Sequence, residues 1–225
     1  MHVSNLSDPS PPRRRTQAER RSRTRAALLE SAARGLSRVG YGNLTLDQVA
    51  SAAGYTRGAL YHHFEGKEDI ALAVVMWVAS TWEHEVWEPA HRETEPVAIL
   101  AALARGHVVY CRRDVARVIM ALRVEFAGRE HPVGETIERI VHGNAQRFAA
   151  LISAGREAGS IPAGPPADML AIAAIGAIEG IAIQVAGDVP HDELVAERAM
   201  LGMLGVDPSS PNPSTRQRAR ASRSV

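Results

Sequence analysis

Residues 45–64, with the sequence TLDQVASAAGYTRGALYHHF, constrain the fold more than any other part of this chain. Thr45 is followed three residues later by Gln48, which is the spacing of a capping box at the start of a helix. Gly54 stands where a left-handed cap would end that helix, because a residue without a Cβ turns there at no cost. Thr56 then begins a second helix with apolar residues four positions apart. The stretch predicts a helix-turn-helix, which lays its second helix in a DNA major groove.

An aromatic run, Tyr61-His62-His63-Phe64, closes this stretch, and Lys67, Glu68 and Asp69 follow it. With these residues the segment resembles the DNA-reading part of the tetracycline-repressor (TetR) family of bacterial transcription regulators. The resemblance covers residues 23–71, and beyond them the chain is similar to the family only in the number and length of its helices. It implies an all-α protein with an N-terminal three-helix DNA-binding domain. A larger helical domain, which binds a ligand and dimerises, is expected to follow.

The first turn of the second helix meets base edges in this mode of docking. Arg57 is the best candidate for direct readout, because a guanidinium can bridge O6 and N7 of guanine. Gly58 allows close approach of the backbone to DNA. His63 is open to a packing and phosphate-facing role or to base reading, and Lys67 to phosphate binding or to an ordinary surface position. The candidate DNA-contacting residues are Thr45, Thr56, Arg57, Gly58, Tyr61, His62, His63 and Lys67.

Charge is distributed unevenly along the chain. Residues 1–70 hold eleven basic and seven acidic side chains (+4), residues 71–205 eleven and seventeen (−6), and residues 206–225 four and one (+3). A basic front and an acidic centre suit a protein that presents one end to a polyanion. We expect a disordered basic arm at 1–19, a DNA-binding domain at 20–66, a ligand-binding and dimerisation domain at 67–205 and a disordered basic tail at 206–225. The arm is either a solvated terminus or a further DNA contact.

Hydrophobic periodicity predicts about nine helices and no strand of useful length. The first runs from about Thr24 to Val39, and the helix after the aromatic run extends from Lys67 to about Glu88, where Pro89 stops it. The remaining helices are expected near residues 97–113, 115–128, 133–159, 169–186 and 192–204. The resemblance implies that the helix from Lys67 transmits ligand binding to the DNA-binding end.

Residues 169–186 are apolar enough to be considered as a membrane span, and Gly176 and Gly180 have GxxxG spacing. Glu179 at the centre argues against lipid, since a carboxylate is costly there. A helix buried on most sides in a soluble homodimer explains the same facts. With the last helix and a symmetry mate it would form a four-helix interface. The predicted interface residues are Ile172, Gly176, Gly180, Met200 and Leu204.

Catalytic and metal-binding signatures are not found in the sequence: it has no nucleotide loop, nucleophile elbow or zinc-finger spacing. Cys111, the single cysteine, rules out an intramolecular disulfide and fits a reducing compartment. The first thirty residues have no apolar segment of a signal peptide. We therefore expect a cytoplasmic, nucleoid-associated protein without cofactor or metal that is not an enzyme.

A ligand pocket in the acidic centre is expected among large side chains and a few polar groups that interrupt apolar helical patterns. An ordinary core with satisfied polar residues would have the same pattern. The candidate ligand-binding residues are Trp77, Tyr110, Arg123, Phe126, Phe148 and Glu179. The predicted function is that of a homodimeric repressor released from a palindromic DNA operator by a small molecule. A ligand-independent regulator or activator, a nonspecific architectural DNA binder and a small-molecule enzyme or carrier are the alternatives.

Overall fold

The structure is a computed structural model that describes residues 16–207, all of whose regular elements are helical. Residues 1–15 and 208–225, which include most of the predicted arm and tail, lie outside the described residues. α5 has only three residues and continues the preceding π-helix, so nine α-helices of five or more residues remain within residues 16–207, as predicted. The elements are α1 (Gln17–Asn43), α2 (Leu46–Ala52), α3 (Arg57–Tyr61), α4 (Lys67–Trp82), the π-helix η1 (Glu83–Trp87), α5 (Glu88–Ala90), α6 (Pro96–Tyr110), the 3-10 helix η2 (Asp114–Arg117), α7 (Val118–Glu125), α8 (Pro132–Glu157), α9 (Ala167–Val185) and α10 (His191–Met203).

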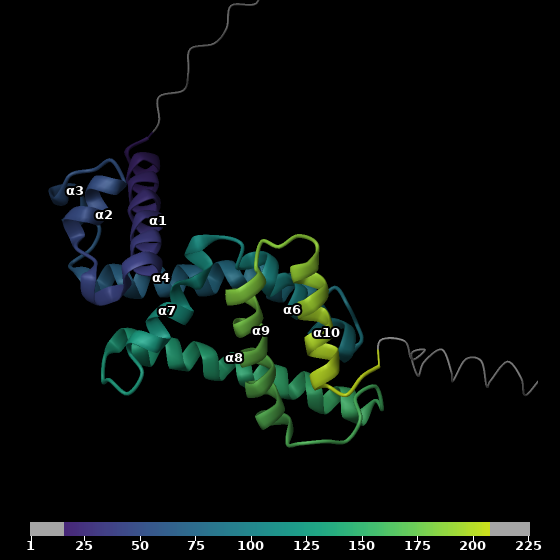
Figure 1. Ribbon diagram of the computed structural model, residues 1–225. Coiled ribbons are helices and arrows are strands. Elements are labelled where there is room, and N and C mark those ends of the chain that lie inside the picture. Colours follow the sequence, from purple (N-terminus) through teal and green to yellow (C-terminus); the bar gives the residue numbers. More distant parts are fainter. Residues whose placement is uncertain (1–15, 208–225) are drawn as a thin grey trace, which may run out of the picture.

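The helices form two parts that share α4 (Figure 1). α1, α2 and α3 make the small domain at one end of the molecule. α4 runs from beneath this domain into the larger part, which we call the body and which comprises α4 to α10. α9 and α10 lie side by side across the body, where α10 packs on α6 and α9 packs on α8.

The first helix begins seven residues earlier than predicted, at Gln17 rather than near Thr24. Thr16 and Glu19 form a capping box, in which the Thr16 hydroxyl accepts from the Glu19 N–H at 3.2 Å and the Glu19 carboxylate accepts from the Thr16 N–H at 2.9 Å. Residues 16–19 were expected in the disordered arm and instead start this helix. Hydrophobic periodicity missed them because the first turns of α1 are exposed on all sides and carry no apolar stripe.

Two other boundaries also differ from the prediction. Pro89 does not stop the helical path, which continues through the π-helical turn η1 to Ala90. Proline is tolerated there because it stands in the first turn of α5, where its missing N–H leaves no bond unmade. The helix expected at 115–128 begins as the 3-10 turn η2 and ends at Glu125, before Gly128 with its φ of 70°.

One continuous cluster of buried apolar side chains connects the small domain to the body. Leu28 of α1 and Leu60 of α3 belong to it, as do Ile70 and Val78 of α4 and Leu103 of α6, all almost fully buried. Ala50 of α2 is 1% exposed. α4 therefore packs against both parts of the molecule along its length.

α9 is the one helix within residues 16–207 that is long and apolar enough, by length and composition, to cross a membrane. Only 28% of its apolar segment is buried inside the single chain. One side of the helix packs on α6, α8 and α10, while Ile172, Gly176 and Gly180 face outward. The outward side is thus an apolar surface that the chain itself leaves uncovered.

Candidate DNA-binding site and ligand cavity

Local capping bonds fix the geometry of the helix-turn-helix. The Thr45 hydroxyl accepts from the Gln48 N–H at 3.3 Å, and the Gln48 side chain accepts from the Thr45 N–H at 3.0 Å. Gly54 follows α2 with φ of 77°, the left-handed conformation predicted for it. The Thr56 hydroxyl then caps α3 by accepting from the Ala59 N–H at 3.2 Å. These bonds fix the start of α3, and Leu60, buried in the core cluster, anchors its inner face.

The first turn of α3 presents an exposed surface. Arg57, Gly58, Tyr61 and His62 are all exposed, and Arg57 donates to Asp47 at 3.1 Å and to the Tyr61 hydroxyl at 3.3 Å. A Cβ built on Gly58 would meet only the Thr56 hydroxyl, at 3.9 Å, so no packing within the chain requires glycine there. The surface is open, and its guanidinium is held only by solvent-exposed partners that exchange easily.

His63 is partly covered and lies next to the arginines at the start of α1. Its partial burial lowers its pKa, and the positive charges of Arg21 and Arg25 lower it further. The Arg25 guanidinium sits 5.1 Å from the centre of the Phe64 ring. The exposed arginines at the start of α1 therefore extend the basic surface beside the recognition helix, whereas His63 itself stays neutral at ordinary pH.

Lys67 lies farther from the recognition surface than the predicted phosphate contact suggests. Its ammonium donates to the Gly42 carbonyl at 3.1 Å and lies 4.7 Å from the centre of the Tyr41 ring. These contacts place it between the end of α1 and the start of α4. Its assignment to DNA remains a prediction.

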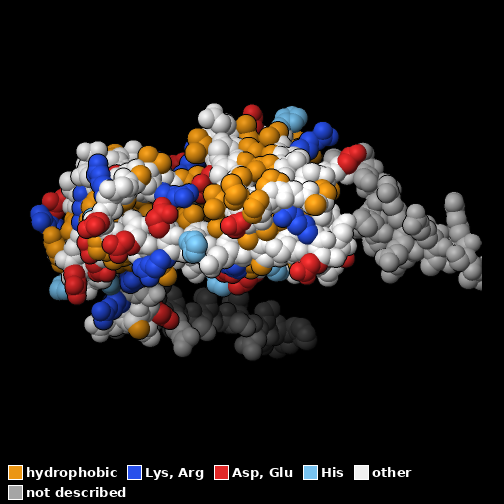
Figure 2. All heavy atoms as spheres, turned by 90° about the horizontal axis from the view of Figure 1, so that it is seen from below, with side chains coloured by type: hydrophobic (Ala, Val, Ile, Leu, Met, Phe, Trp, Pro, Cys, Tyr) orange, Lys and Arg blue, Asp and Glu red, His pale blue; other side chains and the backbone are white. Residues whose placement is uncertain are grey.

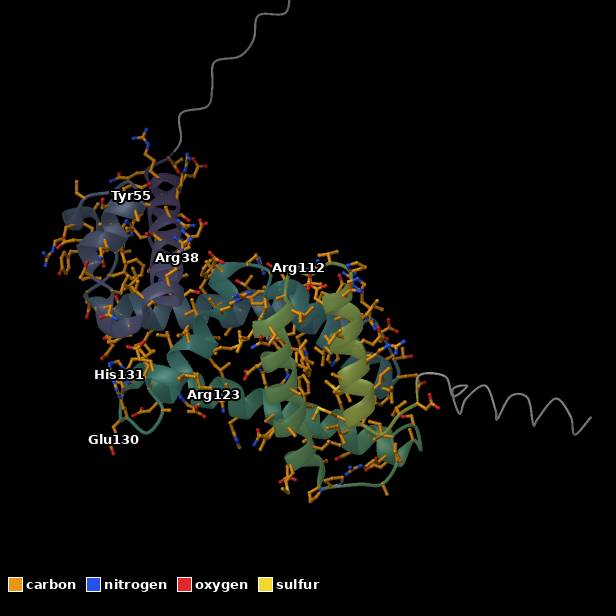
Figure 3. All side chains as sticks on the ribbon, viewed as in Figure 1. Arg38, Tyr55, Arg112, Arg123, Glu130 and His131 are labelled. Carbon is orange, nitrogen blue, oxygen red and sulfur yellow. The ribbon has the colours of Figure 1, made fainter. Side chains whose placement is uncertain are left out.

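The same region joins the small domain to α7. Helical geometry breaks at Gly40, which has φ of 73°, and the Glu125 carboxylate accepts from the next two backbone N–H groups, at 2.6 Å from Tyr41 and 2.7 Å from Gly42. The Tyr41 ring packs edge-on against Phe126 and His131. Figure 3 shows His131 in the loop between α7 and α8, at the end of the body that faces the small domain. We call this set of contacts the joint.

A cavity of about 330 Å³ lies inside the body. Its walls come from α4, α6, α7, α8 and α9, and most of the lining side chains are apolar. Tyr110, Phe148 and Glu179, three of the predicted ligand-binding residues, line it. The sequence prediction missed His107, Arg139 and Arg147, because only packing reveals which polar groups on a helix point inward. Large volume and apolar walls with a few polar groups are typical of a small-molecule site.

Three other predicted ligand-binding residues do not line this cavity, and their contact with a ligand stays a prediction. Trp77 faces α1, beside Leu29 and Arg25. Phe126 packs in the joint, 5.2 Å from the Tyr41 ring centre. Arg123 lies behind the wall, with its Nη1 3.7 Å from the Glu179 carboxylate. Helical periodicity shows that such residues point away from solvent, but it does not show which neighbouring helix each inward-facing side chain contacts.

Most polar groups in the wall already have partners. The Arg147 guanidinium donates to both Glu83 oxygens at 2.7 and 2.8 Å, and the Tyr110 hydroxyl donates to the Val78 carbonyl at 3.0 Å. Trp82 Nε1 donates to His107 Nδ1 at 3.1 Å. Because indole only donates, His107 carries its proton on Nε2, which faces the Cys111 sulfur at 3.4 Å.

Burial determines the protonation states of His107 and Cys111. It lowers the pKa of His107 to about 4 and raises the pKa of Cys111 to about 12. Both groups are therefore neutral at physiological pH. A thiol of this kind packs as a small apolar side chain.

The predicted dimer residues divide into two groups. Ile172 is 64% exposed, and Gly176 and Gly180 face outward beside it. Met200 and Leu204 are 1% and 2% exposed and belong to the core of the single chain, and their role in an interface stays a prediction. α10 turns other residues outward, with Leu194 at 52% and Val195 at 44% exposure. Figure 2, which keeps the horizontal order of Figure 1, shows hydrophobic side chains gathered where α9 and α10 lie.

Within the described part of the chain no group of three or more His, Cys, Asp or Glu side chains is arranged to hold a metal ion. The candidate functional regions are the exposed recognition turn, the joint and the cavity.

Comparisons with known proteins agree with this architecture. The sequence profile described as "Bacterial regulatory proteins, tetR family" matches residues 28–74. The HTH-type transcriptional repressor BepR of Brucella suis biovar 1 (strain 1330) is 30% identical over 159 residues, which cover 66% of this chain and 73% of BepR.

Solved structures show the same fold. A TetR transcriptional regulator from Chloroflexus aurantiacus J-10-FL has a TM-score of 0.70 at 20% identity, over 83% of this chain and 95% of that one. AibR, solved in complex with isovaleryl coenzyme A and operator DNA, has a TM-score of 0.66 at 21% identity, over 81% and 96% of the two chains. The likeness in fold extends through the body, whereas the family profile covers only the helix-turn-helix and its surroundings. The chain therefore belongs to the TetR family of bacterial regulatory proteins and is a DNA-binding transcriptional regulator.

Proposed function

We propose that this protein is a homodimeric repressor that a small molecule releases from a palindromic operator. The observation that carries the proposal is the position of α4. This helix begins at Lys67, just after the recognition helix, and its other end lines the cavity with Val78 and Trp82. Its 16 residues span roughly 24 Å, so one continuous helix touches both the DNA-binding domain and the ligand cavity.

The position of α4 divides the proposed roles between two parts of the chain. Residues 20–66 form the DNA-binding domain, to which the start of α1 at Gln17 adds three residues, and residues 67–205 form the ligand-binding and dimerising body. The recognition turn contacts DNA through Thr56, Arg57 and Gly58, with Arg57 reading base edges. Thr45, Tyr61, His62, His63 and Lys67 supply the surrounding contacts. The protein acts on DNA in the cytoplasm, at the nucleoid, and its role is regulation without catalysis.

Release proceeds by a shift between two states. A ligand that fills the cavity favours one arrangement of α4 and α7, and both helices pack on the small domain. In a dimer this changes the spacing of the two recognition helices, which must fit half-sites about one helical turn of DNA apart, or a multiple of it. The ligand shifts the equilibrium only by its difference in affinity for the two states. AibR, whose fold is similar, was solved with both a ligand and operator DNA.

Arg57→Ala tests the DNA-binding half of the proposal. Fluorescence anisotropy compares a duplex from the gene's own upstream region with a scrambled duplex over a salt series. A guanidinium that reads guanine contributes about 1–3 kcal/mol of discrimination, so we expect the preference for the native duplex to fall about fivefold or more.

Arg34→Ala is the matched control, because Arg34 is a partly exposed arginine of α1 whose side chain pairs with Glu30. Preference for the native duplex should persist in this variant. An unchanged preference in Arg57→Ala would show that Arg57 does not read bases. Equal affinity of the wild-type protein for both duplexes, lost together as salt rises, would leave only counterion release and favour an architectural DNA binder.

A further inference from the structure

The chemical class of the ligand can be argued from the polar groups of the cavity wall. Glu83, Tyr110 and His107 already have hydrogen-bond partners within the chain. A ligand that competed for them would first have to break those bonds. The O–H of Tyr110 and the remaining N–H of His107 are engaged inside the chain, so these groups offer the cavity no free donor.

Glu179 differs from these groups. Its side chain is 22% exposed, it lines the cavity, and within residues 16–207 its carboxylate accepts no hydrogen bond. The nearest cation is Arg123 Nη1 at 3.7 Å, a distance beyond a hydrogen bond, while Arg123 Nε donates to Glu138 at 3.1 Å. Burial raises the pKa of Glu179. A half-buried carboxylate without a donor is costly, and a ligand donor would remove that cost.

The charges around the cavity nearly balance. Glu83 and Arg147 neutralise each other in a two-bond ion pair, and Arg123 stands behind Glu179. Arg139 is exposed and donates to Thr136 at 2.9 Å. The mostly apolar lining holds two carboxylates, Glu83 and Glu179, and two guanidinium groups, Arg139 and Arg147, so a ligand of either charge would meet a like charge there. The balance favours a neutral ligand.

We propose that the cavity binds a neutral, mostly apolar molecule whose hydroxyl group donates a hydrogen bond to Glu179. The inference rests on the proposed ligand-controlled function and adds the chemical class of the ligand. The apolar wall, which includes Phe148 and Ile178, takes the carbon skeleton, and Glu179 on α9 fixes its polar end. Figure 3 places Arg123 on the body near α8, in agreement with its position behind this wall.

Isothermal titration calorimetry on the full-length protein tests the proposal with four probes of one shape: para-butylphenol, its methyl ether, para-butylbenzylamine and para-butylbenzoate. The phenol should bind at least about tenfold tighter than the ether, since a hydrogen bond to a charged acceptor is at stake. In Glu179→Leu this ratio should fall to near one. In Glu138→Gln, which removes a carboxylate from the same network outside the cavity, the ratio should persist.

Glu179→Gln provides a second variant that keeps the side-chain shape. Its neutral amide oxygen accepts a weaker bond, so the ratio of phenol to ether should lie between those of the wild type and Glu179→Leu. The proposal is overturned if the ether binds as tightly as the phenol, if the amine or the benzoate binds tighter, if none of the four binds, or if the Glu179 variants keep the wild-type ratio.

Operator release by the same probes, followed by anisotropy, separates this inference from the proposed function. Selective phenol binding without release would uphold the ligand class and contradict ligand-controlled repression. Release by all four probes alike would uphold ligand control and overturn the role of Glu179.

Discussion

The protonation state of His107 depends on the two side chains that touch it. Trp82 fixes Nδ1 as an acceptor, and the remaining N–H faces the Cys111 sulfur, so the ring has no partner that would stabilise a positive charge. Burial lowers its pKa from 6.5 to about 4. The folded protein therefore holds this histidine neutral, whereas the unfolded chain protonates it near its ordinary pKa.

The free energy of unfolding should consequently fall as pH drops from 6.5 toward 4. Over that range the His107 imidazole binds a proton in the unfolded chain but stays neutral in the folded protein. This difference costs about 1–3 kcal/mol of stability for a ring that partly faces a cavity. Urea unfolding across this range should show a smaller loss for His107→Gln than for the wild type. The exposed His84 provides the control, His84→Gln, which should keep the wild-type loss. Equal losses in all three proteins would contradict the assignment.

The structural positions of some residues could be predicted from their neighbours in the sequence, whereas those of others could not. Thr45, Thr56 and Gly54 were placed correctly because capping and positive φ depend on neighbours within a few positions. The packing of Trp77 against α1 and of Met200 in the core could not be predicted, because helical periodicity indicates an inward face without saying what it packs against. The pairing of His107 with Trp82, 25 positions away, has no signature in the sequence.

At the scale of elements, α7 connects the cavity to the small domain. Ile119 and Met120 near its start line the cavity, and Glu125 at its end accepts from the backbone of Tyr41 and Gly42. The eight residues of the helix span roughly 12 Å. Gly40 is suited to this close approach, since a Cβ there would lie 2.6 Å from a Glu125 oxygen and its φ is 73°. A displacement of the cavity wall thus reaches the end of α1 through one short helix.

Glu125→Gln should destabilise this joint. An amide nitrogen in place of one oxygen cannot accept the backbone N–H that faces it, and the unmade bond costs about 1–3 kcal/mol in the free energy of unfolding. Chemical denaturation measures the loss. Glu130→Gln, an exposed carboxylate in the following loop (Figure 3), should change stability by less than about 0.5 kcal/mol. Equal stability of the two variants would mean that the joint does not depend on the Glu125 carboxylate.

The helix count and the order of the elements were predictable, because apolar periodicity and Pro and Gly positions mark long helices well. The first turns of α1 and the π-helical continuation to Ala90 were not. An exposed helical turn held by its cap has no apolar stripe, and a proline in a first helical turn reads as a stop in the sequence.

At the scale of the whole molecule, two features favour a dimer: the single recognition helix at the basic end and the apolar outer face of α9 and α10. The DNA-binding domain of one chain carries a single recognition helix, whereas a palindromic operator offers two half-sites. The exposed face, which includes Ile172, Ile183 and Leu194, is apolar, and hydrophobic side chains gather there in Figure 2. An apolar patch of this kind marks an interaction site, and we expect a second copy of the chain to cover it by symmetry.

Ile172→Glu should therefore separate the dimer. The substitution places a carboxylate at a side chain that is 64% exposed in the single chain, so the fold should survive. The two-fold contact, however, would bury two negative charges close together. Sedimentation analysis should report a monomer at micromolar concentration. Operator affinity should fall at least about a hundredfold, because the second half-site loses its tethered partner. Val124→Glu, which changes a side chain 79% exposed on α7, should remain dimeric and bind the operator normally. A dimer of Ile172→Glu with wild-type operator affinity would place the interface elsewhere on the molecule.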